Sequence, residues 1–194
     1  MAEAGHISRI PGATYAVSNT GPLISAFQSD SFGLLTEMFP AVFVSTACVA
    51  ELEKHGWERE LRAVSSRLLS VKLTVAETRR ARAVARQIAQ HSDSKDPVAR
   101  HHSGEAEAIV LAQRAEHCSD VRLLDELAAR AIAKQGGLKM SGFPGVLLLA
   151  VQAGIISAED LKTRLELCRS KGTHYGLSFI AQVYEMAKRG HRSL

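Results

Sequence analysis

Four residues with oxygen-bearing side chains occupy comparable places along the sequence: Asn19, Glu51, Glu105 and Asp125. Asn19 and Asp125 come directly after apolar runs that predict strands, whereas Glu51 and Glu105 lie near the start of predicted helices. In an open sheet of parallel strands, ligands bind outside the carboxyl ends of the strands. The pattern therefore predicts that these four side chains line one pocket.

This set of side chains predicts a site for a hard metal ion. Carboxylate and carbonyl oxygens suit Mg²⁺ or Mn²⁺ far better than zinc, which prefers nitrogen and sulfur ligands. None of the eight histidines belongs to an H-x-x-x-H pair. A cation also offsets the repulsion between gathered carboxylates. An ion in such a site can orient a water molecule, lower its pKa and stabilise the charge of an in-line attack on a phosphodiester.

Each of the four residues also has an ordinary structural interpretation. Asn19 could be a turn residue or a helix cap, and Asp125 could cap the helix that follows it. Glu51 and Glu105 could be solvated helix residues. Glu126 competes with Asp125, but a residue at the strand's own end is better aimed at the crevice. Only the recurrence of all four at the same end of successive elements favours the metal site.

The elements that position these residues alternate along the chain. The predicted strands are 15–18, 41–45, 121–124 and 138–141, with a further brief strand at 71–75. Helical patterns cover Pro22 to Leu35, a segment containing Val49 and Leu52, most of 57–92, 104–118, 127–135 and Pro144 to Gly154, and a loop is predicted at 91–97. This alternation of short apolar runs and helical patterns predicts an α/β fold with a doubly wound, mainly parallel sheet flanked by helices.

The two ends of the chain have their own patterns. Residues 1–14 lack the apolar stretch of a secretory signal and predict a flexible leader. Ser157 and Asp160 form a capping-box-like start, and helices at 158–170 and 177–189 predict a helical hairpin within 157–194. The main core is therefore expected in residues 15–156.

Composition narrows the class of protein. Hydrophobic residues make up 46% of the chain, but no apolar stretch approaches the roughly 20 residues of a membrane span. The three cysteines are widely separated and form no C-x-x-C pair, so neither a disulfide framework nor a zinc knuckle is predicted. The chain contains neither G-x-x-x-x-G-K-[ST] nor G-x-G-x-x-G, which argues against those nucleotide-binding loops. Together these features predict a cytoplasmic protein without a membrane anchor.

The charge of the chain suits a polyanionic partner. The net charge is +4, and basic residues outnumber acidic ones from Arg59 to Arg100 and from Lys162 to Arg192. A solvated helix face is the alternative explanation for such stretches. Aromatic residues that could stack on bases are scarce, at 5%.

Four segments together resemble the PIN family of metal-dependent ribonucleases. They are Ser18-Asn-Thr-Gly-Pro-Leu-Ile24, Val49-Ala-Glu51-Leu52, Gly104-Glu-Ala-Glu-Ala-Ile109 and Leu123-Leu-Asp125-Glu-Leu-Ala-Ala-Arg130, in the order and spacing of that domain. The segment Met140-Ser-Gly-Phe-Pro-Gly-Val-Leu147 and the stretch 165–178 also look like a prokaryotic, toxin-like subgroup. The resemblance covers roughly 15–189.

The resemblance implies a role for each position. The four acidic positions of the family fall on Asn19, Glu51, Glu105 and Asp125 as catalytic and metal-binding residues, and asparagine at the first is a departure that removes a negative charge. The family's third acidic residue directly follows a glycine, so Glu105 is preferred to Glu107, which must point to nearly the opposite side of the helix.

Two further residues could support the site. Thr20 resembles the hydroxyl residue that often accompanies the metal site of the family, and Ser141 could line the rim of that site. The turn at 141–145 could also present backbone N–H groups to a phosphate.

The implied function is that of an endoribonuclease dependent on Mg²⁺ or Mn²⁺, and of the toxin half of a toxin-antitoxin pair. RNA, an antitoxin protein and a second copy of the chain in a dimer are the implied partners. Because Asn19 departs from the pattern, the alternative is a catalytically weakened PIN-like module that binds RNA or protein without cutting.

Overall fold

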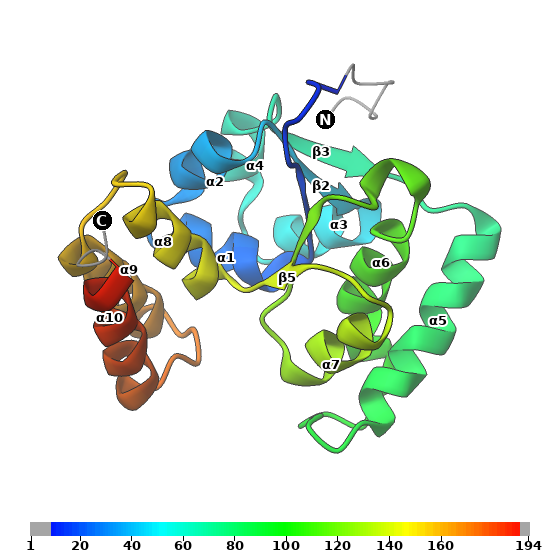
Figure 1. The fold of residues 1–194 in the computed structure, drawn as a ribbon. Helices are drawn as coiled ribbons and strands as arrows, with labels where there is room; N and C mark the ends of the chain where they lie inside the picture. Colours follow the sequence, from blue (N-terminus) through cyan, green and yellow to red (C-terminus); the bar gives the residue numbers. More distant parts are fainter. Residues whose placement is uncertain (1–8, 191–194) are drawn as a thin grey trace.

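A five-stranded parallel sheet forms the centre of the computed structural model, which describes residues 9–190 (Figure 1). The strands are β1 Ala16–Ser18, β2 Val42–Ser45, β3 Leu68–Val71, β4 Val121–Leu123 and β5 Met140–Ser141, in the order β3-β2-β1-β4-β5. Residues 1–8 of the predicted leader and 191–194 of the predicted hairpin lie outside the described residues. The predicted α/β fold with a parallel sheet is confirmed.

The sheet reverses its direction of winding at β1. The chain runs from β1 through β2 to β3 on one side, and then returns to β4 and β5 on the other. β1 lies at the middle, pairing Val17 with Phe43 of β2 and with Arg122 of β4. The carboxyl ends of β1 and β4 therefore lie side by side at the switch point, where doubly wound folds bind their ligands.

Helices cover both faces of the sheet (Figure 1). They are α1 Thr20–Gln28, α2 Phe32–Met38, α3 Thr46–Lys54, α4 Glu58–Ala63, α5 Val75–Gln90, α6 Ser103–Leu111, α7 Leu127–Gln135, α8 Phe143–Gln152, α9 Ala158–Ser170 and α10 Leu177–Gly190, with short 3-10 segments η1 Ala99–His102 and η2 Ala115–His117. One apolar cluster joins α1–α4 and α8–α10, and a second joins α5, α6 and α7. Buried residues of β1 divide between the two, Ala16 in the first and Val17 in the second, as the period of two in a strand requires.

The last two helices pack on the same core as the first ones. Leu161 and Leu165 of α9 and Ile180 and Val183 of α10 are buried together with residues of α1 and α8. Ser157 and Asp160 form a complete capping box at the start of α9. The side chain of Arg164 reaches the backbone oxygen of Ser29 at 3.0 Å, which ties α9 to the end of α1.

Several predicted element boundaries were wrong. The helix expected from Pro22 to Leu35 is two helices, because the chain turns at Asp30, whose φ of 50° lies in the left-handed region. The helix expected over 104–118 ends at Leu111, and only η2 follows it. The last strand is shorter than 138–141, and begins at Met140.

The strand predicted at 71–75 lies earlier, at Leu68–Val71. Leu68 is fully buried and pairs with Val42 of β2, whereas Thr74 is the N-cap of α5. The strand therefore begins at Leu68, which is buried against β2, and ends before Thr74, which caps α5.

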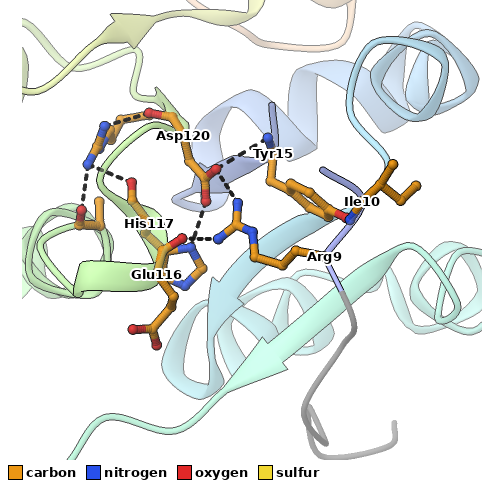
Figure 2. A network of polar contacts seen from close by, with 8 residues as sticks. Arg9, Ile10, Tyr15, Glu116, His117 and Asp120 are labelled. Carbon is orange, nitrogen blue, oxygen red and sulfur yellow. Dashed lines mark hydrogen bonds and ion pairs between the residues drawn. The ribbon is translucent and has the colours of Figure 1, made fainter. Parts of the chain in front are cut away.

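A network of polar contacts lies at the end of the sheet opposite to the carboxyl ends of the strands (Figure 2). Arg9 pairs with Asp120 and lies over the ring of Tyr15, while His117 Nδ1 lies 2.7 Å from Asp120 Oδ2. Burial raises the pKa of Asp120, but hydrogen bonds with His117 and Arg9 outweigh it and hold the pKa below its ordinary value. The network joins the start of the described chain to the segment before β4.

No helix between residues 9 and 190 combines the length and the apolar character needed to cross a membrane.

Candidate active site

Asn19 and Glu105 face each other at the carboxyl end of β1. The amide Nδ2 of Asn19 donates to Glu105 Oε1 at 3.0 Å. Asn19 is the N-cap residue of α1, yet its side chain makes no capping hydrogen bond. Its carbonyl oxygen Oδ1 is buried and has no hydrogen-bond partner among residues 9–190. The ordinary interpretation of Asn19 as a cap therefore does not account for its side chain.

Thr20 and Glu51 form a second pair beside the first. The hydroxyl of Thr20 donates to Glu51 Oε2 at 2.5 Å. A Cβ on Gly104 would lie 3.4 Å from Glu51 Oε2 and 3.6 Å from Thr20 Oγ1. Gly104 thus lets the start of α6 approach this pair closely, and it places the next residue, Glu105, beside Asn19.

Asp125 occupies the end of β4 and is held from two sides. Its Oδ1 accepts from the backbone N–H of Phe143 at 2.9 Å, and its Oδ2 accepts from the hydroxyl of Tyr175 at 3.2 Å. The cap of α7 is Glu126, whose carboxylate accepts from Ala129 N at 2.5 Å. Asp125 is therefore free of the capping role that its position suggested.

Burial is the main cause of a raised pKa at both Glu105 and Asp125. Burial raises the pKa of Glu105, and the nearby carboxylates of Glu51 and Glu126 raise it further. Burial also raises the pKa of Asp125, against the lowering effect of its bonds to Phe143 and Tyr175. A cation among these groups would offset both burial and repulsion.

Gly21 lies close to both Asn19 and Asp125. A Cβ at this position would lie 3.9 Å from Asp125 Oδ2 and 4.0 Å from Asn19 Nδ2. Glycine thus leaves a space that both side chains border. Glu51 lines a cavity of about 420 Å³ with Arg100 and Gly104, and Asp125 lines a separate one of about 510 Å³.

A ready-made cluster of acids is absent from the described part of the chain. No three His, Cys, Asp or Glu side chains there are close enough to hold a metal ion by themselves. The unpartnered carbonyl oxygen of Asn19 supplies an oxygen donor of another kind, next to the carboxylate of Glu105. Together with the carboxylates of Glu105 and Asp125, this oxygen makes a donor set whose chemistry suits a hard divalent cation.

The remaining predicted residues lie as follows. Glu107 lines a groove against α5, together with Arg82 and Arg86. The hydroxyl of Ser141 donates to the backbone oxygen of Gly142 at 3.1 Å. The N–H of Phe143, which belongs to the predicted phosphate-binding turn, instead donates to Asp125.

Tyr175 is a residue of this site that the sequence did not reveal. Its hydroxyl lies 3.2 Å from Asp125 Oδ2 and 3.1 Å from Ser25 Oγ. It belongs to the connection between α9 and α10, and only the packing of that hairpin on α1 brings it here. No local motif marks a tyrosine with such a role.

A comparison with protein families gives a match to this chain. A family model described as a PIN domain matches residues 15–189, which is most of the chain. The chain belongs to the PIN-domain family. PIN domains are typically nucleases and generally use divalent metal ions. Neither the curated proteins nor the solved structures gave a significant match.

Proposed function

We propose that this PIN domain is an endoribonuclease that hydrolyses RNA phosphodiester bonds with Mg²⁺ or Mn²⁺. The observation that carries the proposal is the carbonyl oxygen of Asn19, buried without a partner beside Glu105. A buried acceptor left unsatisfied costs about 1–3 kcal/mol. A metal ion would satisfy this oxygen and neutralise the carboxylates around it.

Each residue has a part in this mechanism. Asn19, Glu105 and Asp125 would hold the ion, which supplies an activated water and neutralises charge on the phosphate. Glu51 would complete the site, with its carboxylate oriented by the hydroxyl of Thr20. The N–H of Phe143, at the start of α8, donates a hydrogen bond that holds the carboxylate of Asp125 in place.

The choice of RNA as substrate is supported by a groove beside the site. Arg82 and Arg86 of α5 and Arg100 of η1 line a groove of about 490 Å³ along α6. Arg100 and Ser103 also line the cavity that contains Glu51. Positive charge thus borders the acidic site on one side, as an acidic centre that binds a polyanion requires.

Cleavage of mixed single-stranded RNA by the purified protein tests the proposal. The wild type should cut with Mg²⁺ or Mn²⁺ and stop cutting in EDTA. Glu105→Gln should lower the rate by on the order of 100-fold or more, because it removes a ligand charge at the reacting centre. Glu107→Gln is the matched control on the same helix. Because Glu107 lines the groove and not the proposed metal site, this variant should cut saturating RNA at the wild-type kcat. Equal rates in the two variants, or cleavage that survives EDTA, would contradict the proposal.

The second candidate is a PIN-like module that binds RNA or protein without cutting. Two observations favour it: Asn19 carries no charge, and both oxygens of Asp125 already accept hydrogen bonds. Asn19→Asp separates the two functions. It replaces the N–H donor to Glu105 by a second carboxylate, so the metal-free variant should be less stable and should regain stability as Mn²⁺ is added.

In an active nuclease, Asn19→Asp should retain or increase cleavage, since an added ligand charge strengthens binding of a hard cation. Asp125→Asn in the same background should abolish cleavage. If wild type and Asn19→Asp both leave varied RNA intact while RNA or partner binding persists, the binding module is the better description.

We also propose, from the resemblance to toxin-like PIN proteins, that the enzyme acts as a cytoplasmic toxin held by an antitoxin, and that it forms dimers. Induced expression should then arrest growth in the wild type and not in Glu105→Gln. Continued growth with active, folded wild-type enzyme would argue against the toxin role. Light scattering of the purified protein tests the dimer.

A further inference from the structure

A cavity of about 510 Å³ lies between two loops at the Asp125 side of the site. One wall is the loop after α5, with Lys95 and Asp96, and the other is the connection between α9 and α10, with His174 and Tyr175. Asp125 lines the space between them. This volume is within the range of small-molecule sites, about 300–1,000 Å³.

Three apolar side chains line part of the cavity. Ile24 of α1, Leu127 of α7 and the ring of Tyr175 line it. Leu127 is 63% exposed although it is the first residue of a helix whose other face is buried. Apolar walls with a few polar groups at the edge are the usual surroundings of a planar ligand.

Hydrogen bonds hold the α9–α10 wall in place without a ligand. Gln28, at the end of α1, donates from Nε2 to Lys171 O at 3.0 Å and accepts at Oε1 from Thr173 Oγ1 at 2.5 Å. Lys171 Nζ donates to the backbone oxygen of Gln28 at 2.6 Å. The ring of Tyr175 also stacks on Phe179, with centroids 5.8 Å apart. The wall is thus preformed, which reduces the entropy cost of binding.

We propose that this cavity is a nucleobase pocket that holds the base adjacent to the cleaved phosphate of the RNA. The proposal rests on the proposed function, since it is Asp125 that the cavity shares with the catalytic site. A strand whose phosphate lies at Asp125 must place a neighbouring base within reach of that carboxylate. Leu127, Ile24 and Tyr175 provide the apolar surface for the base. The polar side chains around it include Lys95 and His174 and the carboxylates of Asp93, Asp96 and Glu126, which could accept hydrogen bonds from the N–H groups of a base.

The test uses a pair of matched leucines. Leu127→Ala shortens one of the apolar side chains that line the cavity. Leu177→Ala makes the same change at the first residue of α10, which is 60% exposed and does not line the cavity. Each of the four 5′-mononucleotides is titrated into the wild type and both variants, followed by NMR of the leucine methyl groups and Tyr175. At least one nucleotide should bind, with shifts at Leu127, and its Kd should be about tenfold weaker in Leu127→Ala and unchanged in Leu177→Ala. The KM for RNA cleavage should change in the same way.

The outcomes separate the pocket from the catalytic proposal. If nucleotides bind at Leu127 but RNA is never cut, the pocket proposal is supported and the nuclease proposal is wrong. If RNA is cut with the same KM by all three proteins, and no nucleotide shifts Leu127 or Tyr175, the pocket is wrong and the nuclease proposal stands. If Leu127→Ala and Leu177→Ala weaken nucleotide binding equally, the pocket proposal is also wrong, because loss of any exposed leucine side chain would then have the same effect.

Discussion

Gly142 leaves the room that the carboxylate of Asp125 occupies. A Cβ on Gly142 would lie only 2.4 Å from Asp125 Oδ1 and 3.2 Å from Arg130 Nη1. Gly142→Ala should therefore displace a carboxylate that Phe143 and Tyr175 now fix. We expect a stability loss of about 1–3 kcal/mol and a loss of RNA cleavage on the order of 100-fold, measured by thermal unfolding and by initial rates.

Gly145→Ala provides the control for this substitution. Its Cβ would also meet a side chain, but that side chain is the hydroxyl of Ser141, which can rotate away. Cleavage should stay close to the wild-type rate. A Gly142→Ala protein that cuts as well as Gly145→Ala would show that the position of Asp125 does not matter for activity.

At the scale of single residues, part of the site could be predicted from the sequence. Asn19 and Asp125 follow strands, so topology places them at one edge whatever the details of packing. The choice of Glu105 over Glu107 stays a prediction. It rests on the divergence of positions two apart on a helix, and Glu105 is the one of the two that accepts a hydrogen bond from Asn19. Tyr175 could not be predicted, because its place beside Asp125 depends on long-range packing of the C-terminal helices.

At the scale of elements, α5 is stabilised at its start by a charged pair as well as by its cap. Thr74 and Glu77 form a capping box, and Glu77 also accepts from Arg114 Nε at 2.8 Å. The hydrogen bond from Arg114 is the main reason that the pKa of Glu77 falls to about 2. This pair joins α5 to the segment after α6.

Because the pKa of Glu77 is lowered on folding, its contribution to stability is present above the ordinary value of 4.5 and is lost as pH falls toward about 2. Glu77→Gln should therefore reduce the free energy of unfolding near pH 7 by about 1–2 kcal/mol. The difference from wild type should close as pH falls from 4.5 to 2. Urea unfolding at a series of pH values measures it.

Glu53→Gln, at an exposed position of α3, is the control for the change in charge. It should alter stability little at any pH. A difference between wild type and Glu77→Gln that stays constant down to pH 2 would mean that the carboxylate charge does not stabilise α5.

Element types were predicted better than element ends. The alternation of apolar runs and helical patterns predicted the α/β fold, since periodicity reports which face of an element is buried. The break at Asp30 and the position of β3 depend on a left-handed turn and on pairing with β2, respectively. Neither leaves a clear local pattern, because the apolar residues continue on both sides of the turn.

At the scale of the whole molecule, the basic residues predicted between Arg59 and Arg100 do not all gather in one place. Arg82, Arg86 and Arg100 line the groove along α6, whereas Arg59 and Arg62 are exposed on α4 and do not line it. Replacing the three groove arginines by glutamine should weaken RNA binding and reduce the slope of log K against log salt by about 2, at about 0.7 per phosphate contact on a single strand.

Arg59→Gln combined with Arg62→Gln is the control, and it should change this slope much less. Fluorescence anisotropy with a labelled single-stranded RNA, over a series of salt concentrations, gives both slopes. If the two sets of substitutions weaken binding equally, the groove has no special role and overall charge accounts for RNA affinity.

The central claim is that Asn19 and Glu105 form the core of a divalent-metal site, and anomalous diffraction from crystals soaked in Mn²⁺ tests it most directly. The account predicts a peak that contacts Asn19 Oδ1 and the carboxylate of Glu105, next to Asp125. The peak should disappear in Glu105→Gln crystals and persist in Glu107→Gln crystals. A wild-type protein with no peak at this position, or with Mn²⁺ bound only elsewhere, would contradict the account.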